Sequence, residues 1–465
     1  MARYTRQQLL KDVPVRRAVA AMALPTVISQ IISIIYNLAD IFFVGQIGDP
    51  DKVAAVSLVA PAFMITTALG NLFGIGGSSA ISRALGKGNA ELAKRTSTFC
   101  FYASIGAAAL YSALLALFAK PFLRFYGASD ATLPYAVEYT VWVLMVGAVP
   151  TVANVVLAHM LRADGKPRVA SFGLSMGGIL NMLLDPLFIL AFGLGVTGVA
   201  LATMLSNAAV LVFFLLYRTR CADSILDLSP ADLSGSFRRE VSGPVMASGI
   251  PAAVQTFVVS LFFMFLNRQA RAYSDVHVAA MGIVQKLDNI PQYVSLGFAQ
   301  GIIPLLGFAY AAGNYERMRS VSRFAVRVSV LFALLYVAVV EIFAPVLVRW
   351  FIPDSPATIS LGTRFARIIC VCTPLMAVCN IKNSTFQATG QARQALSICL
   401  FRKVYVGLPM LYLLDRLLPE LGILIVTAVV DGIACFYVVY LERRFYRKLE
   451  GRELPGGSGA SCDRG

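Results

Sequence analysis

The stretch "IIYNLADIFFVG", residues 34–45, places one acidic residue, Asp40, inside a run of apolar residues. Similar runs recur along the chain, and each is long enough at about 20 residues to cross about 30 Å of hydrocarbon. We predict spans at residues 18–43, 53–78, 97–119, 133–160, 169–192, 196–217, 244–267, 278–308, 325–348, 360–386, 396–414 and 420–441. Backbone groups in lipid must hydrogen-bond within their own segment, so we expect an all-α integral membrane protein with twelve transmembrane helices.

The composition supports a membrane protein and offers little for catalysis. The 465 residues are 58% hydrophobic and only 14% charged, which is far more apolar than a typical soluble domain. His159 and His277 are the two histidines, and they lie far apart in the sequence. The eight cysteines form no C-x-x-C pair. Zinc or Ser-His-Asp chemistry is therefore poorly supported, and we expect neither an enzyme nor a cofactor.

The net charge of +15 comes from basic residues that gather in alternate loops. We count Arg393, Arg402 and Lys403 among the residues of these loops. The positive-inside rule places the basic loops and both termini in the cytoplasm. The charge therefore indicates topology in the cell membrane and contact with membrane lipid, and we expect no binding of nucleic acid.

The chain also repeats itself. The segment "LRADGKPR" begins at Leu161 and "FQATGQAR" begins 225 residues later, at Phe386. The pair Gly88-Asn89 matches Gly313-Asn314 at the same spacing. Because each half holds six spans, the halves are parallel and related by a pseudo-twofold axis along the membrane normal, as in secondary transporters. We predict an N-lobe at 1–220, a cytoplasmic linker at 221–243, a C-lobe at 244–445 and a cytoplasmic polar tail at 446–465.

Polar residues form a stripe along the first predicted span. The stripe consists of Thr26, Gln30, Ser33, Asn37 and Asp40, which are spaced for one helix face and flanked by Tyr36. Such a stripe in lipid must face the protein interior or a water-filled cavity. Asn181 and Asp185 share a face of the fifth span, and Asn154 and Thr203 are further polar groups at interior depth.

Two carboxyl groups inside the membrane are energetically unfavourable, so their presence has to be explained. A charge at mid-bilayer costs about 2.5–3.5 kcal/mol, and desolvation favours the neutral form. Asp40 and Asp185 could therefore share a proton as a coupled pair, or bind Na⁺ together with neutral oxygen donors from Asn154, Asn181 and Thr203. Alternatively, Asp40 lies at the outer interface and Asp185 hydrogen-bonds locally. The repeat places Leu266 near the position of Asp40 and Met410 near that of Asp185, which favours function over a structural role.

An ordered set of motifs resembles the MATE (multidrug and toxin extrusion) family, in its DinF-like and MepA-like bacterial branch. The motifs are "YNLADIFFVG", "GNAELAKR", "RADGKPR" before "NMLLDPLFIL", and "GIIPLLGFAYAAGN" before "FQATGQAR". The resemblance covers about residues 15–445. It implies two lobes, an outward-facing cavity that opens by rocking, and export of organic cations in exchange for inward H⁺ or Na⁺. The family's N-lobe cation site matches Asp40, Asn154, Asn181, Asp185 and Thr203. For the substrate cavity and gating we expect Pro25, where the first helix would bend, with Gln30, Ser33, Tyr36, Asn37, Gln255 and Asp288.

Other interpretations stay open at this point. Spans seven and ten carry Gln255 and Asn380 instead of acids, and Asp288 either contributes to transport or contacts Lys286. A flippase of the same superfamily for a lipid-linked or amphipathic substrate is the nearest alternative, with a basic central cavity. Apart from Lys286 and Lys382, we expect the residues in the middle of the spans to be acidic or neutral. This favours cationic amphipathic substrates. A membrane prenyltransferase would need an acid at Ile189. We expect a monomer.

Overall fold

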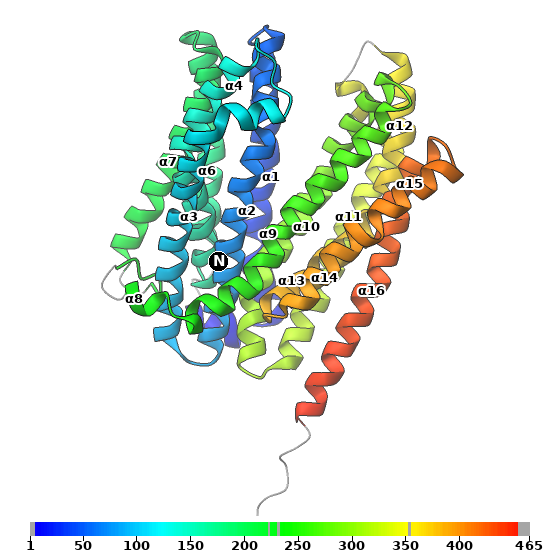
Figure 1. Cartoon of the computed structure of the whole chain (residues 1–465). Coiled ribbons are helices and arrows are strands. Elements are labelled where there is room, and N and C mark those ends of the chain that lie inside the picture. The colour runs from blue at the N-terminus through cyan, green and yellow to red at the C-terminus, as the bar shows by residue number, and fades with distance from the viewer. Residues whose placement is uncertain (1–4, 222–223, 230–232, 352–354, 454–465) are drawn as a thin grey trace, which may run out of the picture.

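The computed structural model describes residues 5–221, 224–229, 233–351 and 355–453, and all regular elements within these ranges are helices (Figure 1). Ten of the described helices are long and apolar enough to cross a membrane, and the total reaches twelve if two bent pairs each form one span. The predicted all-α membrane fold is confirmed, and each predicted span falls on one of these helices or pairs.

The first half of the chain forms one bundle of helices. Its elements are η1 (Gln8–Asp12), α1 (Val15–Gly45), α2 (Pro50–Gly86), α3 (Ala90–Phe125), α4 (Leu133–Thr140), η2 (Val141–Val146), α5 (Ala148–Ala163), α6 (Pro167–Pro186), η3 (Leu187–Ala191) and α7 (Gly195–Arg220). The second half forms another bundle. Its elements are α9 (Arg239–Arg271), α10 (Asp275–Ala311), α11 (Tyr315–Phe351), α12 (Pro356–Cys370), α13 (Thr373–Ala388), α14 (Ala392–Leu400), η5 (Phe401–Tyr405), α15 (Gly407–Leu417) and α16 (Leu421–Glu453). The short helix α8 (Leu233–Ser236), which precedes α9 in the chain, packs against α3 of the first bundle (Figure 1).

Two spans are bent at equivalent places in the two bundles. The axis turns by 45° between Leu133–Val146 and Ala148–Ala163, and by 44° between α12 and α13. Gly147 stands at the first bend, where a Cβ atom would lie 2.5 Å from the carbonyl oxygen of Val143. Pro374 follows the second bend at the start of α13, where its missing N–H costs no helical hydrogen bond. Glycine and proline thus set where these spans bend.

The two bundles pack together at one end of the molecule and diverge toward the other (Figure 1). We call the packed end the basic end, defined by the loops 87–89, 164–166 and 312–314. Glycines allow the helices to approach closely there. A Cβ atom on Gly249 of α9 would lie 2.0 Å from the carbonyl oxygen of Leu72, and one on Gly301 of α10 would lie 2.6 Å from Cα of Ala23.

Arg83 fastens the two bundles at the basic end. One guanidinium nitrogen of Arg83 donates to Ser79 Oγ at 2.6 Å on its own helix, and to Ser248 Oγ at 3.3 Å and the Ala388 carbonyl oxygen at 3.1 Å in the other bundle. The second nitrogen donates to the Pro244 carbonyl oxygen at 3.2 Å. A single side chain of α2 therefore bonds to both α9 and α13.

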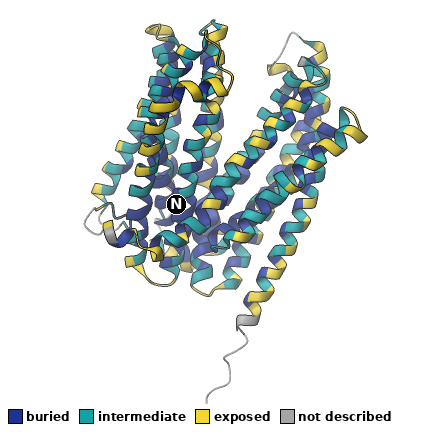
Figure 2. Ribbon diagram, in the orientation of Figure 1, coloured by how far each residue is buried: buried dark blue, intermediate teal, exposed yellow. Residues whose placement is uncertain are grey.

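Burial follows the expectation for a protein in lipid. Buried residues line the interior of each bundle, and exposed residues cover its outside (Figure 2). Many of the exposed side chains are large and apolar, among them Leu117, Ile342 and Phe436. Met22 and Ala23 of α1 belong to the same buried cluster as Ile302 of α10, so the first helix packs into the core of the second bundle.

One placement from the sequence is wrong. Arg402 and Lys403 do not lie in a basic loop but in η5, within the candidate span Ala392–Leu417. Lys403 is buried, and the Arg402 guanidinium is held by the carboxylate of Asp431. Inside the bundle an ion pair stabilises Arg402, and the ring of Phe262 lies beside the Lys403 ammonium group, so counting charges by loop misplaced both residues.

Candidate functional site

The predicted polar residues of α5, α6 and α7 come together inside the first bundle. Asp185 of α6 is fully buried and accepts a hydrogen bond from Asn181 Nδ2 at 3.3 Å, one helical turn away. The same nitrogen lies 3.5 Å from Thr203 Oγ1 on α7. The spacing of four residues within α6 puts both side chains on the face that meets α7.

Asn207 completes this cluster and was missed in the sequence. Asn154 Nδ2 on α5 donates to the Asn207 carbonyl oxygen at 2.8 Å and to its Oδ1 at 3.3 Å. Asn207 Nδ2 in turn donates to the Thr203 carbonyl oxygen at 2.9 Å. Asn207 follows Thr203 by one helical turn, so helical spacing from Thr203 was a usable signal. The residue connects Asn154 to the other members.

Asp40 approaches this cluster from α1. The charges of Asp40 and Asp185 are close enough to act on each other, and both act on Tyr139 of α4. Tyr36 packs against α6, because a Cβ atom at Gly178 would lie 2.9 Å from its ring. Gly178 thus permits the close approach that brings α1 beside α6. No motif in the sequence pointed to Tyr139.

The cluster keeps oxygen atoms available for a ligand. Within the part of the chain that the structure describes, Asp40 Oδ1, Asn154 Oδ1 and Asp185 Oδ2 are each buried and have no hydrogen-bond partner. Buried oxygens of this kind are costly unless a proton or a cation joins them. Carboxylate and amide oxygens are also the ligands that hard cations prefer. We call Asp40, Asn154, Asn181, Asp185, Thr203 and Asn207 the N-lobe cluster.

The residues predicted for the cavity and gating are spread over several environments. Gln30 Nε2 donates to Gln300 Oε1 at 3.4 Å and so joins α1 to α10 in the other bundle. Ser33 and Asn37 instead donate to carbonyl oxygens of their own helix. Pro25 lies inside a continuous α1 and lines a groove on the side of α1 that faces α6. Of these residues, Gln30 is the one whose side chain bonds across the two bundles.

Gln255 and Asp288 belong to a second polar cluster, in the second bundle. Gln255 Oε1 accepts hydrogen bonds from Asn383 Nδ2 at 3.1 Å and from Gln387 Nε2 at 3.3 Å. Asp288 lies within range of the charges of Arg402, Lys403 and Asp431. Arg402 and Asp431 form a two-point ion pair, with N–O distances of 2.6 and 2.8 Å.

Lys286 is in contact with an aromatic ring and is not one of the charged residues of the second polar cluster. The sequence left open a contact between Asp288 and Lys286. In the structure the ammonium group of Lys286 instead lies 5.6 Å from the ring centre of Phe351. The charged members of the second cluster are therefore two acids and two bases, Asp288, Asp431, Arg402 and Lys403, and the expectation that mid-span positions are acidic or neutral fails here. A further lysine in a span, Lys382, bonds to Glu442 at 2.6 Å.

Comparison with known proteins settles the family. The MatE family profile matches residues 25–187 and again residues 251–413. The chain belongs to the MatE family. The two matches are offset by 226 residues, which agrees within one residue with the repeat spacing of 225 seen in the sequence. This MATE protein is therefore a multi-pass membrane transporter, and the prenyltransferase interpretation is excluded.

Relatives of this MATE protein extend over most of its length. The multidrug export protein MepA of Staphylococcus aureus (strain MRSA252) is 29% identical over 92% of this chain and 94% of its own. MepA of Staphylococcus saprophyticus is 26% identical over 90% of this chain and 92% of its own. These matches favour multidrug export over the flippase alternative.

Solved MATE structures superpose closely on this protein. An outward-facing multidrug resistance transporter of the MOP superfamily gives a TM-score of 0.91 at 26% identity, over 97% of this chain and 100% of its own. A MOP superfamily transporter from Pyrococcus furiosus, described as having a binding pocket of reversed polarity, gives 0.88 at 25% identity, over 97% and 99%. The diverging bundles of Figure 1 thus correspond to a known MATE arrangement.

Proposed function

We propose that this MATE transporter exports drug-like, cationic amphipathic molecules from the cell in exchange for inward H⁺ or Na⁺. The observation that carries the proposal is the N-lobe cluster, in which Asp40 and Asp185 each keep a buried oxygen with no hydrogen-bond partner among the described residues. Two neighbouring carboxylates in a low-dielectric site repel each other, so they gain from binding a proton or a cation.

The charge of the two clusters supports a cationic substrate. The N-lobe cluster contains two carboxyl groups and no basic residue. The second cluster balances Arg402 and Lys403 against Asp288 and Asp431. The net negative charge of the two clusters therefore comes from Asp40 and Asp185 in the first bundle. A cationic substrate and the coupling ion would both lower this charge, and their competition is the basis of exchange.

The cycle follows from the arrangement of the bundles. In this structure the bundles are joined at the basic end and diverge at the other, where the coupling ion enters. Binding of H⁺ or Na⁺ at the N-lobe cluster neutralises the carboxylates and weakens the hold on a cationic substrate. The bundles then rock, the ion leaves toward the basic end, and the recharged site takes up the next substrate. Each ligand drives this exchange only through its different affinity for the two arrangements.

We place the basic end, the linker and both termini in the cytoplasm of a cell whose plasma or inner membrane holds the protein. Phe237, which is exposed at the basic end, and Asp130, which is exposed at the opposite end, give a direct comparison. In a variant without native cysteines, Asp130→Cys should react with an impermeant maleimide added to intact cells, and Phe237→Cys should react only after the cells are opened. The reverse pattern would overturn the orientation.

The coupling is tested by uptake into everted membrane vesicles, where export appears as accumulation. Ethidium should accumulate when the vesicle interior is made acidic, or when it is loaded with Na⁺, and the matching ionophore should abolish the effect. Membranes without the protein serve as the control. Accumulation under neither gradient would contradict the proposed exchange. Accumulation under only one would identify the coupling ion.

A further inference from the structure

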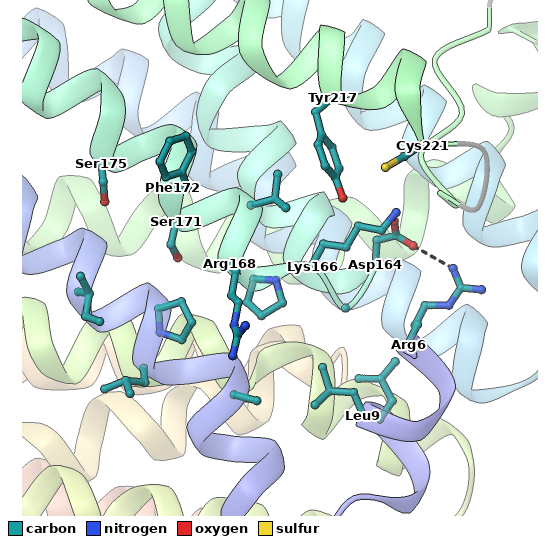
Figure 3. Close-up of a pocket in the computed structure, with 18 of the residues that line it drawn as sticks. Arg6, Leu9, Asp164, Lys166, Arg168, Ser171, Phe172, Ser175, Tyr217 and Cys221 are labelled. Carbon is teal, nitrogen blue, oxygen red and sulfur yellow. Dashed lines mark hydrogen bonds and ion pairs between the residues drawn. The ribbon is translucent and has the colours of Figure 1, made fainter. Parts of the chain in front are cut away.

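A long groove runs along the side of the first bundle between α1 and α6. It has a volume of about 2270 Å³, and Arg6 and Leu9 of the amino-terminal segment before α1 line one end of it (Figure 3). Sites for drug-sized ligands usually measure about 300–1,000 Å³. The groove is therefore large enough for a ligand with long chains, and it lies apart from the N-lobe cluster.

The end of the groove nearest the basic end is strongly positive. Five basic residues and one acid line it there, namely Arg6, Arg17, Lys166, Arg168, Arg220 and Asp164. Asp164 is buried and pairs with Arg6 at 2.9 Å and with Lys166 at 2.8 Å. Among the described lining residues the five bases thus outnumber the one acid, which favours an anionic group at this end. Figure 3 shows Arg6 from the amino-terminal segment paired with Asp164, with Lys166 beside them.

The remainder of the groove is apolar and directed along the helices. Leu24 and Ile28 on α1 are spaced by one helical turn, and Phe172, Ile179 and Leu183 follow one another along α6. All five side chains are exposed, from 46% for Ile179 to 65% for Leu183. Two apolar rows thus start beside the basic residues and run into the membrane. Exposed apolar rows that meet a cationic patch match an amphiphile with an anionic head.

We propose that this groove binds one anionic phospholipid from the leaflet at the basic end. The phosphate lies at the cationic end among Arg17, Arg168 and Arg220, and the acyl chains lie along the rows of α1 and α6. Pro25 lines the same groove, so the bound lipid contacts α1 where the helix contains its proline. The proposal does not depend on which substrate or coupling ion the transporter uses.

The test uses a tryptophan placed in the groove. Trp142 and Trp350 are replaced by phenylalanine, and Phe172→Trp becomes the probe. The purified full-length protein is reconstituted into vesicles of brominated phosphatidylglycerol or brominated phosphatidylcholine, mixed with unbrominated phosphatidylcholine. The brominated anionic lipid should quench the probe several-fold more effectively. Equal quenching by the two lipids would overturn the proposal.

A matched pair of variants separates the groove from general surface charge. Arg17→Gln with Arg168→Gln should lower the preference for the anionic lipid, by up to about fivefold for each arginine removed. Arg323→Gln with Arg327→Gln on α11 removes the same charge away from the groove and should leave the preference intact. Both variants are checked for an unchanged thermal unfolding midpoint, and a groove variant that unfolds early is replaced by Arg220→Gln. An equal loss in both variants, or a loss in neither, would also overturn the proposal.

Discussion

Asn207 shows how single side chains hold the N-lobe cluster together. Its backbone carbonyl oxygen and its Oδ1 both accept from Asn154 Nδ2 on α5, and its Nδ2 donates to the Thr203 carbonyl oxygen. Asn181 Nδ2 donates to Asp185 Oδ1 and lies near Thr203 Oγ1. A donor or acceptor left unsatisfied in such a site costs about 1–3 kcal/mol. The positions of the oxygens that we propose for ion binding therefore depend on neutral residues as well as on the two acids.

We predict that Asn207→Leu lowers both stability and gradient-driven export. The change removes the Asn207 Oδ1 acceptor of Asn154 Nδ2 and the Asn207 Nδ2 donor to the Thr203 carbonyl oxygen, while the backbone carbonyl of residue 207 is kept. Loss of these two side-chain hydrogen bonds should lower the free energy of unfolding by about 1–3 kcal/mol. Thermal unfolding in detergent and ethidium transport measure the two effects. Asn37→Leu is the matched control for stability, because Asn37 is exposed and bonds to its own helix. An unfolding midpoint equal to that of the control would argue against the bridging role.

The sequence predicted part of the cluster at this scale. Residues on one helix face are found from their spacing, and this is how Asp40, Asn181 and Asp185 were identified. Contacts between helices are different, because they depend on rotations that spacing does not define. The sequence therefore gave no sign of Tyr139 near Asp40, or of Arg402 opposite Asp431. The proposed roles of the cluster residues stay predictions.

Among the elements, η5 shows how charged residues are accommodated inside the second bundle. Arg402 and Lys403 follow each other in a short π-helical stretch between α14 and α15. Arg402 meets Asp431 of α16, whereas the ammonium group of Lys403 lies 4.4 Å from the ring centre of Phe262 on α9. Two adjacent residues thereby connect η5 to two other helices. The mean hydropathy of the span Ala392–Leu417 is high enough for a membrane helix, so it gives no indication of these two contacts.

We predict that Asp431→Asn destabilises the protein strongly. Removing one partner of a buried ion pair leaves the other charge uncompensated, which costs about 3–5 kcal/mol. Replacing both partners, by Arg402→Met with Asp431→Leu, should restore most of the loss in the thermal unfolding midpoint. The exposed pair of Arg124 and Asp130, at 3.1 Å, offers the control, and Asp130→Asn should change the midpoint little. A midpoint for Asp431→Asn that matches this control would contradict the expected cost.

For the molecule as a whole, the two bundles are held by a few specific contacts at the basic end. Arg83 bonds to both α9 and α13, and close glycine contacts allow α2 to lie against α9. The repeat and the positions of the apolar spans could be predicted from the sequence, because both leave periodic traces in it, and the predicted twelve spans agree with the structure if its two bent pairs are each one span. The arrangement with joined basic ends could not, because one sequence must support more than one arrangement during transport.

We predict that Arg83→Ala shifts the protein toward separation at the basic end. Charge-assisted hydrogen bonds contribute about 1.5–3 kcal/mol, so the equilibrium between the arrangements should move by about 10- to 150-fold. Spin labels at Lys87→Cys and Arg393→Cys, in a variant without native cysteines, report the distance across this end. Arg95→Ala on α3 is the control for loss of a nearby arginine. Identical distance distributions with and without Arg83 would show that other contacts hold the bundles.

The two acids of the N-lobe cluster carry the central claim. Asp40→Asn and Asp185→Asn preserve size and hydrogen bonding but remove the charge, and a neutral amide is less costly in lipid than a charge. Each variant should therefore express and insert at least as well as the unmodified protein. Leu266, at the matching place in the repeat, is buried in the apolar core of the second bundle and makes a poor control. Asp130→Asn applies the same chemical change at an exposed site.

The most direct measurement is ethidium accumulation in everted vesicles with an acidic or Na⁺-loaded interior, compared at equal amounts of inserted protein. Asp40→Asn and Asp185→Asn should each lose accumulation, and the double variant should be little worse than either, because the two groups act as one coupled site. Asp130→Asn should retain full accumulation. Full accumulation by both single variants would contradict the account, and the two carboxyl groups would then be structural.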